Sequence, residues 1–546
     1  MKASDLLVKC LEAEEIKYIF GVPGEENLDL LESIRQSSIK FITTRHEQAA
    51  VFMAATVGRL TGKTGVALST LGPGATNLVT GVAYAQLGGM PLLVITGQKP
   101  IRKSKQGRFQ ILDVVQMMSP ITKLSQVIVS GDRIPSLIRQ AFKLSQSELP
   151  GAVHLELPED IAAEETSAIP IIPTKIRRSG PDPKAIDQAL SLLLNAKSPI
   201  VLVAAGANRK LVRKHLQAFL DKTQIPFIST QMGKGVIDEK SSLYLGTTAL
   251  SSGDFVHAML KKSDCILVVG HTIKEKPPVV LSAQERRVIH LDFNEAEVDD
   301  VYIPTLEVVG DISHSLWALT QAVDKLPHWD FDYFYDLKEK LQAHIAQKST
   351  DNSFPIKPQR LVQDLRSALP PNGILTLDNG MYKLWVARNY SAHEQNTVLL
   401  DNALATMGAG LPSAIAAKIL DPNRSVVALV GDGGLMMSSQ EIETAIRLGL
   451  NLVIVIVNDN GYGMIRWKQQ SAKFDNFGLD FGNPDFVKFA ESFGAHGVRI
   501  ESATEFLPAV KKALDAKGVW LIDCPIDYSE NNLVFDRELK EKINNL

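Results

Sequence analysis

The sequence has 546 residues, which is too long for one hydrophobic core and predicts three or four domains of ordinary size. Apolar residues make up 45% of it and charged residues 22%, and the net charge of −3 gives no electrostatic reason to expect nucleic acid or an anionic membrane as a partner. The three cysteines have no metal-ligand spacing and suit a reducing compartment.

The first stretch of the chain is typical of an amphipathic helix. Leu6, Leu7, Cys10 and Leu11 form an apolar stripe, and Ser4 or Asp5 is expected to cap the N-terminus of the helix. Charged residues interrupt the apolar ones, so no signal-peptide centre exists, and no run is long enough to span a bilayer. We therefore expect a cytoplasmic protein with no membrane partner.

Short apolar runs alternate with helical segments along most of the chain, which predicts α/β domains with doubly wound parallel sheets. We place three such domains at residues 1–170, 185–325 and 355–546, with a proline-rich linker near 165–184. A weak repeat supports this division, because residues 151–160 and 518–527 keep a glycine, a proline and an aspartate at the same offsets. The expected strands cover residues 41–44, 66–69, 91–96, 200–205, 227–230, 265–269, 288–292, 426–430 and 452–457.

Glycine-rich or polar turns follow the expected strands of the first domain. One strand runs into the Gly-Val-Pro-Gly turn at 21–24, the next into Arg45-His46-Glu47, and the third into Leu-Gly-Pro-Gly-Ala-Thr-Asn at 71–77. A buried carboxyl group is costly without a partner, so Glu47 at a strand end is a candidate functional residue. The alternative is an exposed glutamate paired with Arg45. We expect no role for His46.

Residues 426–467 predict a strand, a glycine turn, a helix, a second strand and a polar loop. The first strand ends at Gly-Asp-Gly-Gly (431–434), and the second ends at Asn-Asp-Asn-Gly (458–461). Since parallel strands open on the same edge of a sheet, Asp432 and Asp459 can converge there. Two oxygen ligands beside a glycine-rich anion cradle suit a Mg²⁺ ion that holds a diphosphate. Two ordinary acidic turns are the alternative.

This stretch resembles the thiamin diphosphate (ThDP) signature, a GDG turn followed by an NN or ND pair. The resemblance implies that Asp432, Asp459 and the backbone carbonyl of Gly461 bind Mg²⁺, which clamps the cofactor diphosphate. Usual members carry Asn where Asp459 stands, whereas acetolactate synthases of the catabolic kind resemble this chain in having Asp. The other cofactor contacts that the resemblance implies in this stretch are Gly431, Gly433, Gly434, Asn460, Tyr462, Gly463 and Met464. Gly380 and Met381 stand where the family has further diphosphate contacts, although this segment departs from its more frequent Gly-Gln-His.

A second group of positions, spread over the first and third predicted domains, is also similar to the ThDP family. In that family a buried glutamate hydrogen-bonds the pyrimidine ring of the cofactor and promotes deprotonation of its C2 carbon, and Glu47 in TRHEQAA is similar to that glutamate. Met407 in TMGAGLP matches the apolar residue beneath the bent cofactor, although a core methionine is the alternative. The remaining implied contacts are Pro23, Gly24, Thr70, Gly74, Asn77 and Thr406.

The resemblance to acetolactate synthases covers the whole chain, through RHEQAAVFMA, LGPGATNLVTG, Phe109-Gln110 and TMGAGLP. It implies that one pyruvate loses CO₂ and that the remaining two-carbon unit joins a second pyruvate or another 2-keto acid to give 2-acetolactate. Gln110 would reach the site across a subunit interface and stabilise the reacting oxygen, with an ordinary polar loop residue as the alternative. Such sites lie between the first domain of one subunit and the third of another, so a homodimer or a homotetramer is implied.

Two departures from the family pattern limit these expectations. Lys468 stands where relatives that make branched-chain amino acids have a tryptophan, so the choice between pyruvate and 2-ketobutyrate as acceptor stays open. Residues 269–275 lack the RFDDR-like segment that helps such relatives hold FAD, so we predict no FAD. One alternative is another ThDP-dependent 2-keto acid decarboxylase or carboligase, and the lack of a His-His pair disfavours the decarboxylase. The other is a non-catalytic ThDP-fold binding subunit, which the retained acidic residues disfavour.

Overall fold

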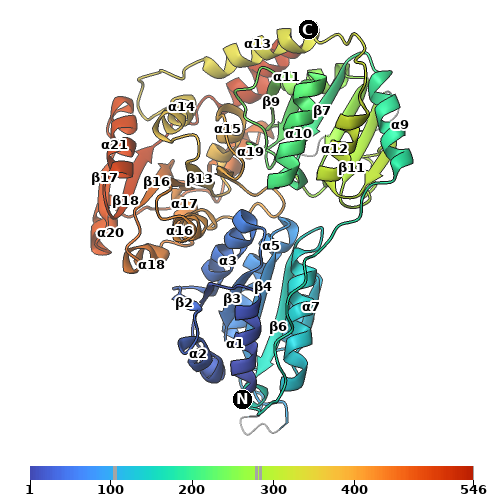
Figure 1. Ribbon diagram of the computed structural model, residues 1–546. Helices are drawn as coiled ribbons and strands as arrows, with labels where there is room; N and C mark the ends of the chain where they lie inside the picture. The colour runs from blue at the N-terminus through green and yellow to red at the C-terminus, as the bar shows by residue number, and fades with distance from the viewer. Residues whose placement is uncertain (103–106, 277–280, 282–285, 545–546) are drawn as a thin grey trace. The chain divides into compact units, whose positions relative to one another are not determined.

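The strands of the protein form three six-stranded parallel sheets with helices on their faces, in a computed structural model that describes residues 1–102, 107–276, 281 and 286–544 (Figure 1). This confirms the predicted doubly wound α/β class. The chain divides into two units: unit 1 holds residues 1–177, 404–422 and 437–450, and unit 2 holds residues 178–403, 423–436 and 451–546. Each sheet lies within one of the three predicted domain ranges, whose limits stay a prediction.

Unit 1 contains the first sheet, in the order β2-β1-β3-β4-β6-β5. Its strands are β1 (Tyr18–Gly21), β2 (Lys40–Thr43), β3 (Gly65–Ser69), β4 (Leu92–Gln98), β5 (Leu124–Val127) and β6 (Ala152–Pro158). Its helices are α1 (Ala3–Ala13), α2 (Leu28–Arg35), α3 (Glu47–Thr61), α4 (Pro73–Asn77), α5 (Val79–Leu87), α6 (Val114–Met118), α7 (Ile134–Gln146), α8 (Glu159–Ala162), α16 (Gly410–Leu420) and α18 (Glu441–Arg447). Helices α1, α2 and α7 share one apolar core with alternate strand residues such as Val66 and Leu68, because successive side chains of a strand point to opposite faces.

The start of α1 differs from the prediction. Lys2 is the N-cap residue and makes no side-chain cap, so the expected cap at Ser4 or Asp5 is wrong. Both side chains lie within the first turn and point toward α2, where the Ser33 hydroxyl lies 3.0 Å from Ser4 Oγ and 2.7 Å from Asp5 Oδ1. The first turn is therefore fixed by a neighbouring helix rather than by its own cap.

Unit 2 contains the central sheet, in the order β12-β11-β10-β7-β8-β9. Its strands are β7 (Pro199–Val203), β8 (Phe227–Thr230), β9 (Tyr244–Thr248), β10 (Cys265–Val269), β11 (Arg287–Asp292) and β12 (Leu306–Val309). The surrounding helices are α9 (Pro183–Leu194), α10 (Lys210–Thr223), α11 (Phe255–Lys262), α12 (Ile312–Ala322) and α13 (Asp332–Ala346). Val201 and Val203 pack toward α9, α10 and α12, whereas Ile200 and Leu202 belong to the core on the other face. This burial on both faces explains the unbroken apolar strand sequences.

The third sheet also lies in unit 2, in the order β14-β13-β15-β16-β18-β17. Its strands are β13 (Ile374–Leu377), β14 (Val398–Leu399), β15 (Val426–Gly431), β16 (Leu452–Asn458), β17 (His496–Arg499) and β18 (Val519–Pro525). The helices are α14 (Pro358–Ala368), α15 (Met381–Asn389), α17 (Asp432–Leu435), α19 (Gly463–Ser471), α20 (Phe486–Ser492), α21 (Ala503–Asp515) and α22 (Leu539–Asn544). Taken in chain order, the strands of the first and third sheets are arranged identically, and the sequence repeat at 151–160 and 518–527 covers β6 and β18, which hold the same place in each.

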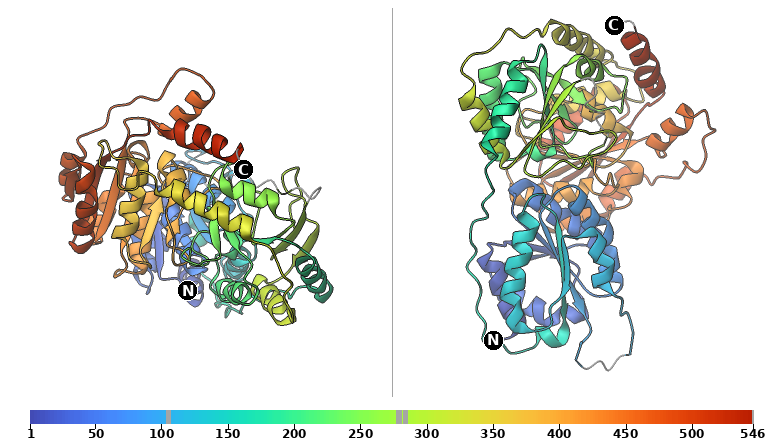
Figure 2. Two further views of the ribbon diagram at one scale, coloured as in Figure 1. Left: turned by 90° about the horizontal axis from the view of Figure 1, so that it is seen from above. Right: turned by 90° about the vertical axis from the view of Figure 1, so that its right-hand side faces the viewer.

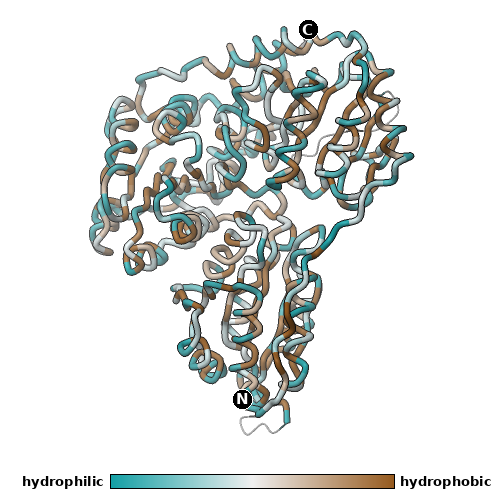
Figure 3. Tube along the Cα trace, viewed as in Figure 1, coloured by the Kyte–Doolittle hydropathy of each residue, from teal (hydrophilic) through white to brown (hydrophobic). Residues whose placement is uncertain are grey.

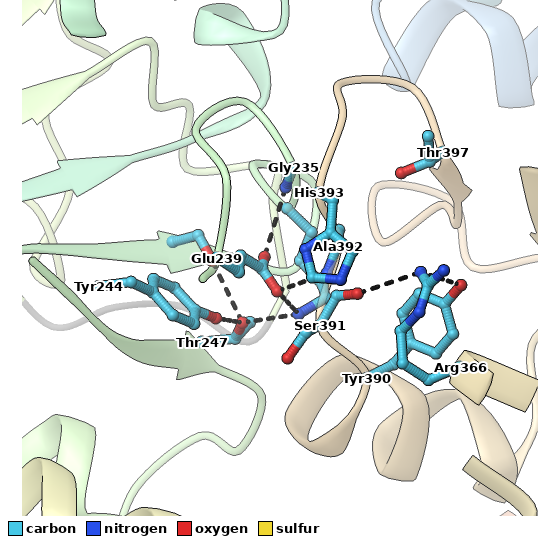
Figure 4. A network of polar contacts seen from close by, with 12 residues as sticks. Gly235, Glu239, Tyr244, Thr247, Arg366, Tyr390, Ser391, Ala392, His393 and Thr397 are labelled. Atoms are coloured by element: carbon cyan, nitrogen blue, oxygen red, sulfur yellow. Dashed lines mark hydrogen bonds and ion pairs between the residues drawn. The ribbon is translucent and has the colours of Figure 1, made fainter. Parts of the chain in front are cut away.

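Within unit 2, a buried carboxylate connects the central sheet to the segment that follows α15. The two oxygens of Glu239 accept hydrogen bonds from Lys234 Nζ at 2.9 Å, Gly235 N at 3.3 Å and Ala392 N at 2.9 Å. Figure 4 shows Glu239 beside Ala392, with Tyr244 and Thr247 close by. A cavity of about 310 Å³ next to this network is lined by β9, α13 and α14, among other segments, and by none of the predicted site residues.

Figure 2 shows the helices beside the strands from two further sides. Apolar residues gather along the strands, and the helices carry both apolar and hydrophilic residues (Figure 3). Among the helices of the described residues, none is long and apolar enough to cross a membrane.

Candidate active site

Glu47 is the first residue of α3 and is 9% exposed. Its Oε2 atom accepts a hydrogen bond from Asn77 Nδ2 at 2.9 Å. A Cβ atom at Gly74 would lie 3.4 Å from Glu47 Oε1 and 2.9 Å from Thr70 Cγ2, so glycine is the residue that leaves room beside the carboxylate. Four residues predicted from sequence therefore lie together at one end of the first sheet.

His46, for which the sequence suggested no role, is the N-cap residue of α3. Its Nδ1 atom accepts a hydrogen bond from Gln48 N at 3.1 Å. This bond satisfies one of the free N–H groups at the start of the helix. His46 thus fixes where α3 begins and so fixes the position of Glu47.

The glycine turn after β1 packs directly on Thr70. A Cβ atom at Gly24 would lie 2.3 Å from Thr70 Cβ, while the neighbouring Pro23 is exposed. Thr70 Oγ1 donates to Glu26, whose other oxygen accepts from Lys99 Nζ at 2.6 Å. Burial favours a higher pKa for Glu26, but the hydrogen bonds from Lys99 and Thr70 outweigh it and hold the pKa below its usual value. The sequence analysis missed this buried ion pair, although Glu26 lies only two residues after the predicted turn.

Two further predicted residues lie in turns near this group. Gln110 is exposed with a φ of +58°, and a Cβ atom at Gly72 would lie 3.1 Å from Gln110 Cβ. Met407 is half-buried just before α16, and Thr406 Oγ1 donates to its carbonyl at 3.0 Å. The next residue, Gly408, has a φ of +84°, and a Cβ atom there would lie 3.8 Å from the Gln48 amide nitrogen. Unit 1 thus contains the whole predicted group around Glu47.

Asp432 and Asp459 follow the neighbouring parallel strands β15 and β16, in which Gly431 pairs with Val457. Asp432 is 1% exposed and accepts a hydrogen bond from Gly433 N at 2.8 Å. Burial and the nearby negative charge of Asp432 raise the pKa of Asp459 to about 7. The two carboxylates therefore lie at the same edge of the sheet and repel each other.

Two groups that were not predicted from sequence, a side-chain amide and a guanidinium, contact these carboxylates. Asn483 Nδ2 lies 2.8 Å from Asp432 Oδ2, 3.2 Å from Asn458 Oδ1 and 3.2 Å from Asn460 Oδ1. Arg466 NH1 lies 3.1 Å from Asp459 Oδ2. Carboxylate and amide oxygens thus surround the Asn483 amide nitrogen, and oxygen atoms of these kinds are the ligands that Mg²⁺ prefers. In the described ranges, no group of three or more His, Cys, Asp or Glu residues is arranged to hold a metal ion, so amide and carbonyl oxygens would have to complete a metal site.

Glycines keep the main chain close to these groups. A Cβ atom at Gly433 would lie 2.9 Å from the Tyr462 ring, one at Gly461 2.3 Å from Arg466 NH2, and one at Gly463 2.6 Å from Asp459 Oδ2. The first turn of α19, which holds Met464, therefore packs tightly beside Asp459. A glycine-lined turn lets the main chain approach a diphosphate closely.

Gly380 and Met381 lie at the start of α15, with Gly380 as the N-cap residue. Their connection to the glycine turn is Tyr382, whose hydroxyl accepts a hydrogen bond from Gly431 N at 2.9 Å. At Gly434, a Cβ atom would lie 2.4 Å from Asp378 Oδ2. Tyr382 follows two residues predicted from sequence but gave no signal of its own, because a single tyrosine in a helix is usually a core residue.

The two groups provide different chemistry. The group in unit 1 holds one buried carboxyl against a neutral amide, an arrangement suited to proton exchange with a bound ring nitrogen. The group in unit 2 offers carboxylate and amide oxygens together with N–H groups, which suits a divalent cation and a diphosphate. These residues fit ThDP and Mg²⁺, and the individual assignments stay predictions.

Comparisons with known proteins match all three parts of the chain. Residues 1–117 match the N-terminal TPP binding domain of thiamine pyrophosphate enzymes, residues 186–319 the central domain, and residues 378–524 the C-terminal TPP binding domain.

Among curated proteins, an acetolactate synthase of Bacillus subtilis (strain 168) is 33% identical over 99% of this chain and 96% of its own length. A catabolic acetolactate synthase of Raoultella terrigena is 32% identical over 97% of this chain and 96% of its own length. A probable acetolactate synthase large subunit of Methanococcus aeolicus is 32% identical over 97% and 92%.

Proposed function

Because the chain belongs to the acetolactate synthase family of thiamine pyrophosphate-dependent enzymes, we propose that it forms 2-acetolactate and CO₂ from two molecules of pyruvate. The observation that carries the proposal is the similarity to acetolactate synthases over nearly the whole of both chains. The placement of Glu47, Asp432 and Asp459 supports it, because the reaction needs both a proton-exchanging carboxyl group and a site for the cofactor diphosphate.

Asp432, Asp459 and the carbonyl of Gly461 would hold Mg²⁺, and the glycine turn at 431–434 would let the main chain approach the diphosphate closely. When bound, ThDP supplies a carbon that adds to a 2-keto acid and accepts the electrons left when CO₂ departs. Gly380 and Met381 would line the same cradle, because Tyr382 connects them to Gly431.

Glu47 would exchange a proton with the cofactor ring through its carboxyl oxygens. Its low exposure and its amide partner keep the group in a place where few water molecules can compete for that proton. Asn77 orients the carboxylate, and the lack of a side chain at Gly74 leaves room on its other side. Met407 would support the bent cofactor, and Gln110 would donate to the reacting oxygen.

We further propose that the enzyme works without FAD. The main chain after β7 is where a doubly wound sheet offers N–H groups to a dinucleotide phosphate. Here the N–H of Ala205 already donates to Glu275 at 2.9 Å, and the other oxygen of Glu275 accepts from Thr230 at 2.6 Å. The absorbance spectrum of the purified protein tests this, since a flavin band would contradict it.

We propose that the working form is a homodimer or a homotetramer in the cytoplasm. Cys10, Cys265 and Cys524 are buried free thiols, which suits a reducing compartment. Analytical ultracentrifugation of the loaded protein distinguishes the two assemblies, and a monomer that turns over pyruvate would contradict both.

The proposed function is tested by supplying pyruvate to the purified protein with and without ThDP and Mg²⁺. Acetolactate and CO₂ should form only when both cofactors are present. Acetaldehyde in place of acetolactate would indicate the alternative, a 2-keto acid decarboxylase. Cofactor binding without any turnover would indicate a non-catalytic subunit. Adding 2-ketobutyrate as a competing acceptor then measures the acceptor preference.

A further inference from the structure

The segment between β2 and α3 is fastened by a helix that is remote from it in sequence. The bond from Thr44 N to Gly21 O, at 2.9 Å, continues the ladder between β2 and β1, and the N–H groups of Arg45 and His46 lie beyond it. Glu441, the first residue of α18 and also part of unit 1, accepts from Arg45 N at 3.0 Å. The N–H of His46 also hydrogen-bonds to this carboxylate.

Glu441 is 0% exposed, and the only other group that bonds to it among the described residues is the Thr444 hydroxyl, at 2.6 Å. A buried carboxylate is costly unless hydrogen bonds satisfy it. Here those bonds come mainly from the backbone of the segment before α3. On the same helix, Arg447 NH2 donates to the Thr43 carbonyl at 2.5 Å. Helix α18 therefore holds both the end of β2 and the turn that follows it.

We propose that Glu441 is a positioning residue that fixes the backbone entering α3 and thereby places the Glu47 carboxylate. Asn77 holds the carboxylate end of Glu47, and Glu441 holds its main-chain end two residues away. The bond from Thr44 Oγ1 to the His46 carbonyl, at 3.0 Å, completes the turn. The effect of this placement on catalysis rests on the proposed function. The claim that Glu441 fixes the backbone does not.

The mechanical part is tested by amide hydrogen exchange on the full-length protein without cofactor. Glu441→Leu removes every acceptor at similar volume, and exchange at Arg45 and His46 should become about tenfold faster or more. Glu441→Gln keeps one acceptor oxygen and should give an intermediate rate. Unchanged exchange at these two amides in a folded Gln or Leu variant would overturn the proposal.

Glu12→Gln is the matched control. Glu12 makes the same kind of contact, since it accepts from Ser38 N at 2.9 Å and from Ser38 Oγ at 2.7 Å, but on α1. This change should speed exchange at Ser38 and leave Arg45 and His46 as they are. Faster exchange at all three amides in both variants would indicate general loosening and contradict a specific role of Glu441.

The catalytic consequence is tested by the rate at which bound ThDP exchanges its C2 proton for deuterium. A misplaced Glu47 should slow this exchange and lower kcat in the same proportion, by about tenfold or more in Glu441→Leu, with partial recovery in Glu441→Gln. The KM for ThDP should change by less than about threefold, because the diphosphate site is elsewhere. Normal C2 exchange despite loosened amides would overturn the proposal. A wild-type protein that forms no acetolactate would instead contradict the proposed function and leave the amide result standing.

Discussion

The first and third sheets have the same strand order but present different chemistry at the same place. After the third strand of each sheet, the chain enters a glycine turn, at residues 70–74 in one and 431–434 in the other. The first turn has no carboxylate and packs beside Glu47, whose oxygen faces a neutral amide. The second turn contains Asp432, and burial together with the charge of Asp432 raises the pKa of Asp459. One sheet edge therefore suits proton exchange, and the other suits a cation.

The largest effect is expected from removing the cation. Treatment with a chelator should abolish acetolactate formation, and added Mg²⁺ should restore it, because the paired carboxylates of unit 2 cannot hold a diphosphate by themselves. Activity that survives exhaustive chelation would contradict the assignment of a cation site to the edge of the third sheet.

Glu47→Gln should impair proton exchange at the edge of the first sheet and leave the cation site of the third sheet intact. We expect kcat to fall by about 10²–10⁴-fold, because the variant cannot exchange a proton, while binding of ThDP and Mg²⁺ stays close to that of the wild type. Steady-state kinetics and calorimetric titration of the cofactor measure the two parts. Unchanged turnover would revive the interpretation as a binding subunit and overturn the role of Glu47.

Lys99→Met tests the buried ion pair that supports the Gly24 turn. The side chains of Lys99 and Glu26 are 7% and 6% exposed, so the change leaves a buried carboxylate without its cation. We expect a loss of about 3–5 kcal/mol in the free energy of unfolding, measured with denaturant. Adding Glu26→Gln should recover part of the loss. If Lys99→Met alone is as stable as the wild type, the ion pair contributes little to the free energy of unfolding.

The smallest effect is expected at Arg466, whose side chain is 26% exposed and pairs with Asp459. Arg466→Gln removes a positive charge that competes with a cation for the same carboxylate, so the affinity for Mg²⁺ should rise about two- to fivefold. The cation-free protein should lose up to about 1 kcal/mol of stability, because the two aspartates then repel each other without compensation. A weaker affinity for Mg²⁺ in this variant would contradict a competing role.

Much of the fold could be predicted from local pattern. The strand predicted at 265–269 is β10, and those at 426–430 and 452–457 are β15 and β16 to within one residue at either end. These strands are buried on both faces, so their apolar runs are unambiguous. The cap of α1 was not predictable in this way, since Ser4 and Asp5 point toward a neighbouring helix instead of the helix end.

The candidate site was predictable only where its residues stand in recognisable motifs. Glu47, Asp432 and Asp459 follow strands, and parallel strands open on one edge. Glu26 and Lys99 gave no signal, because a carboxylate and an amine far apart in sequence are normally exposed. Asn483 and Glu441 were missed for the same reason, as their partners lie 51 and 396 residues away.

By itself, the sequence determined the alternation of strands and helices, the position of the glycine turns and the residues whose carboxyl groups end up beside them. Those features depend on neighbouring residues, through backbone geometry and the two-residue period of a strand. Only the tertiary structure decided that Glu26 pairs with Lys99, Asp459 with Arg466 and Glu47 with a neutral amide, and which backbone segment Glu441 holds. Such contacts depend on distances in space between segments that share no local pattern, because charge and hydrogen bonding act through space and not along the chain.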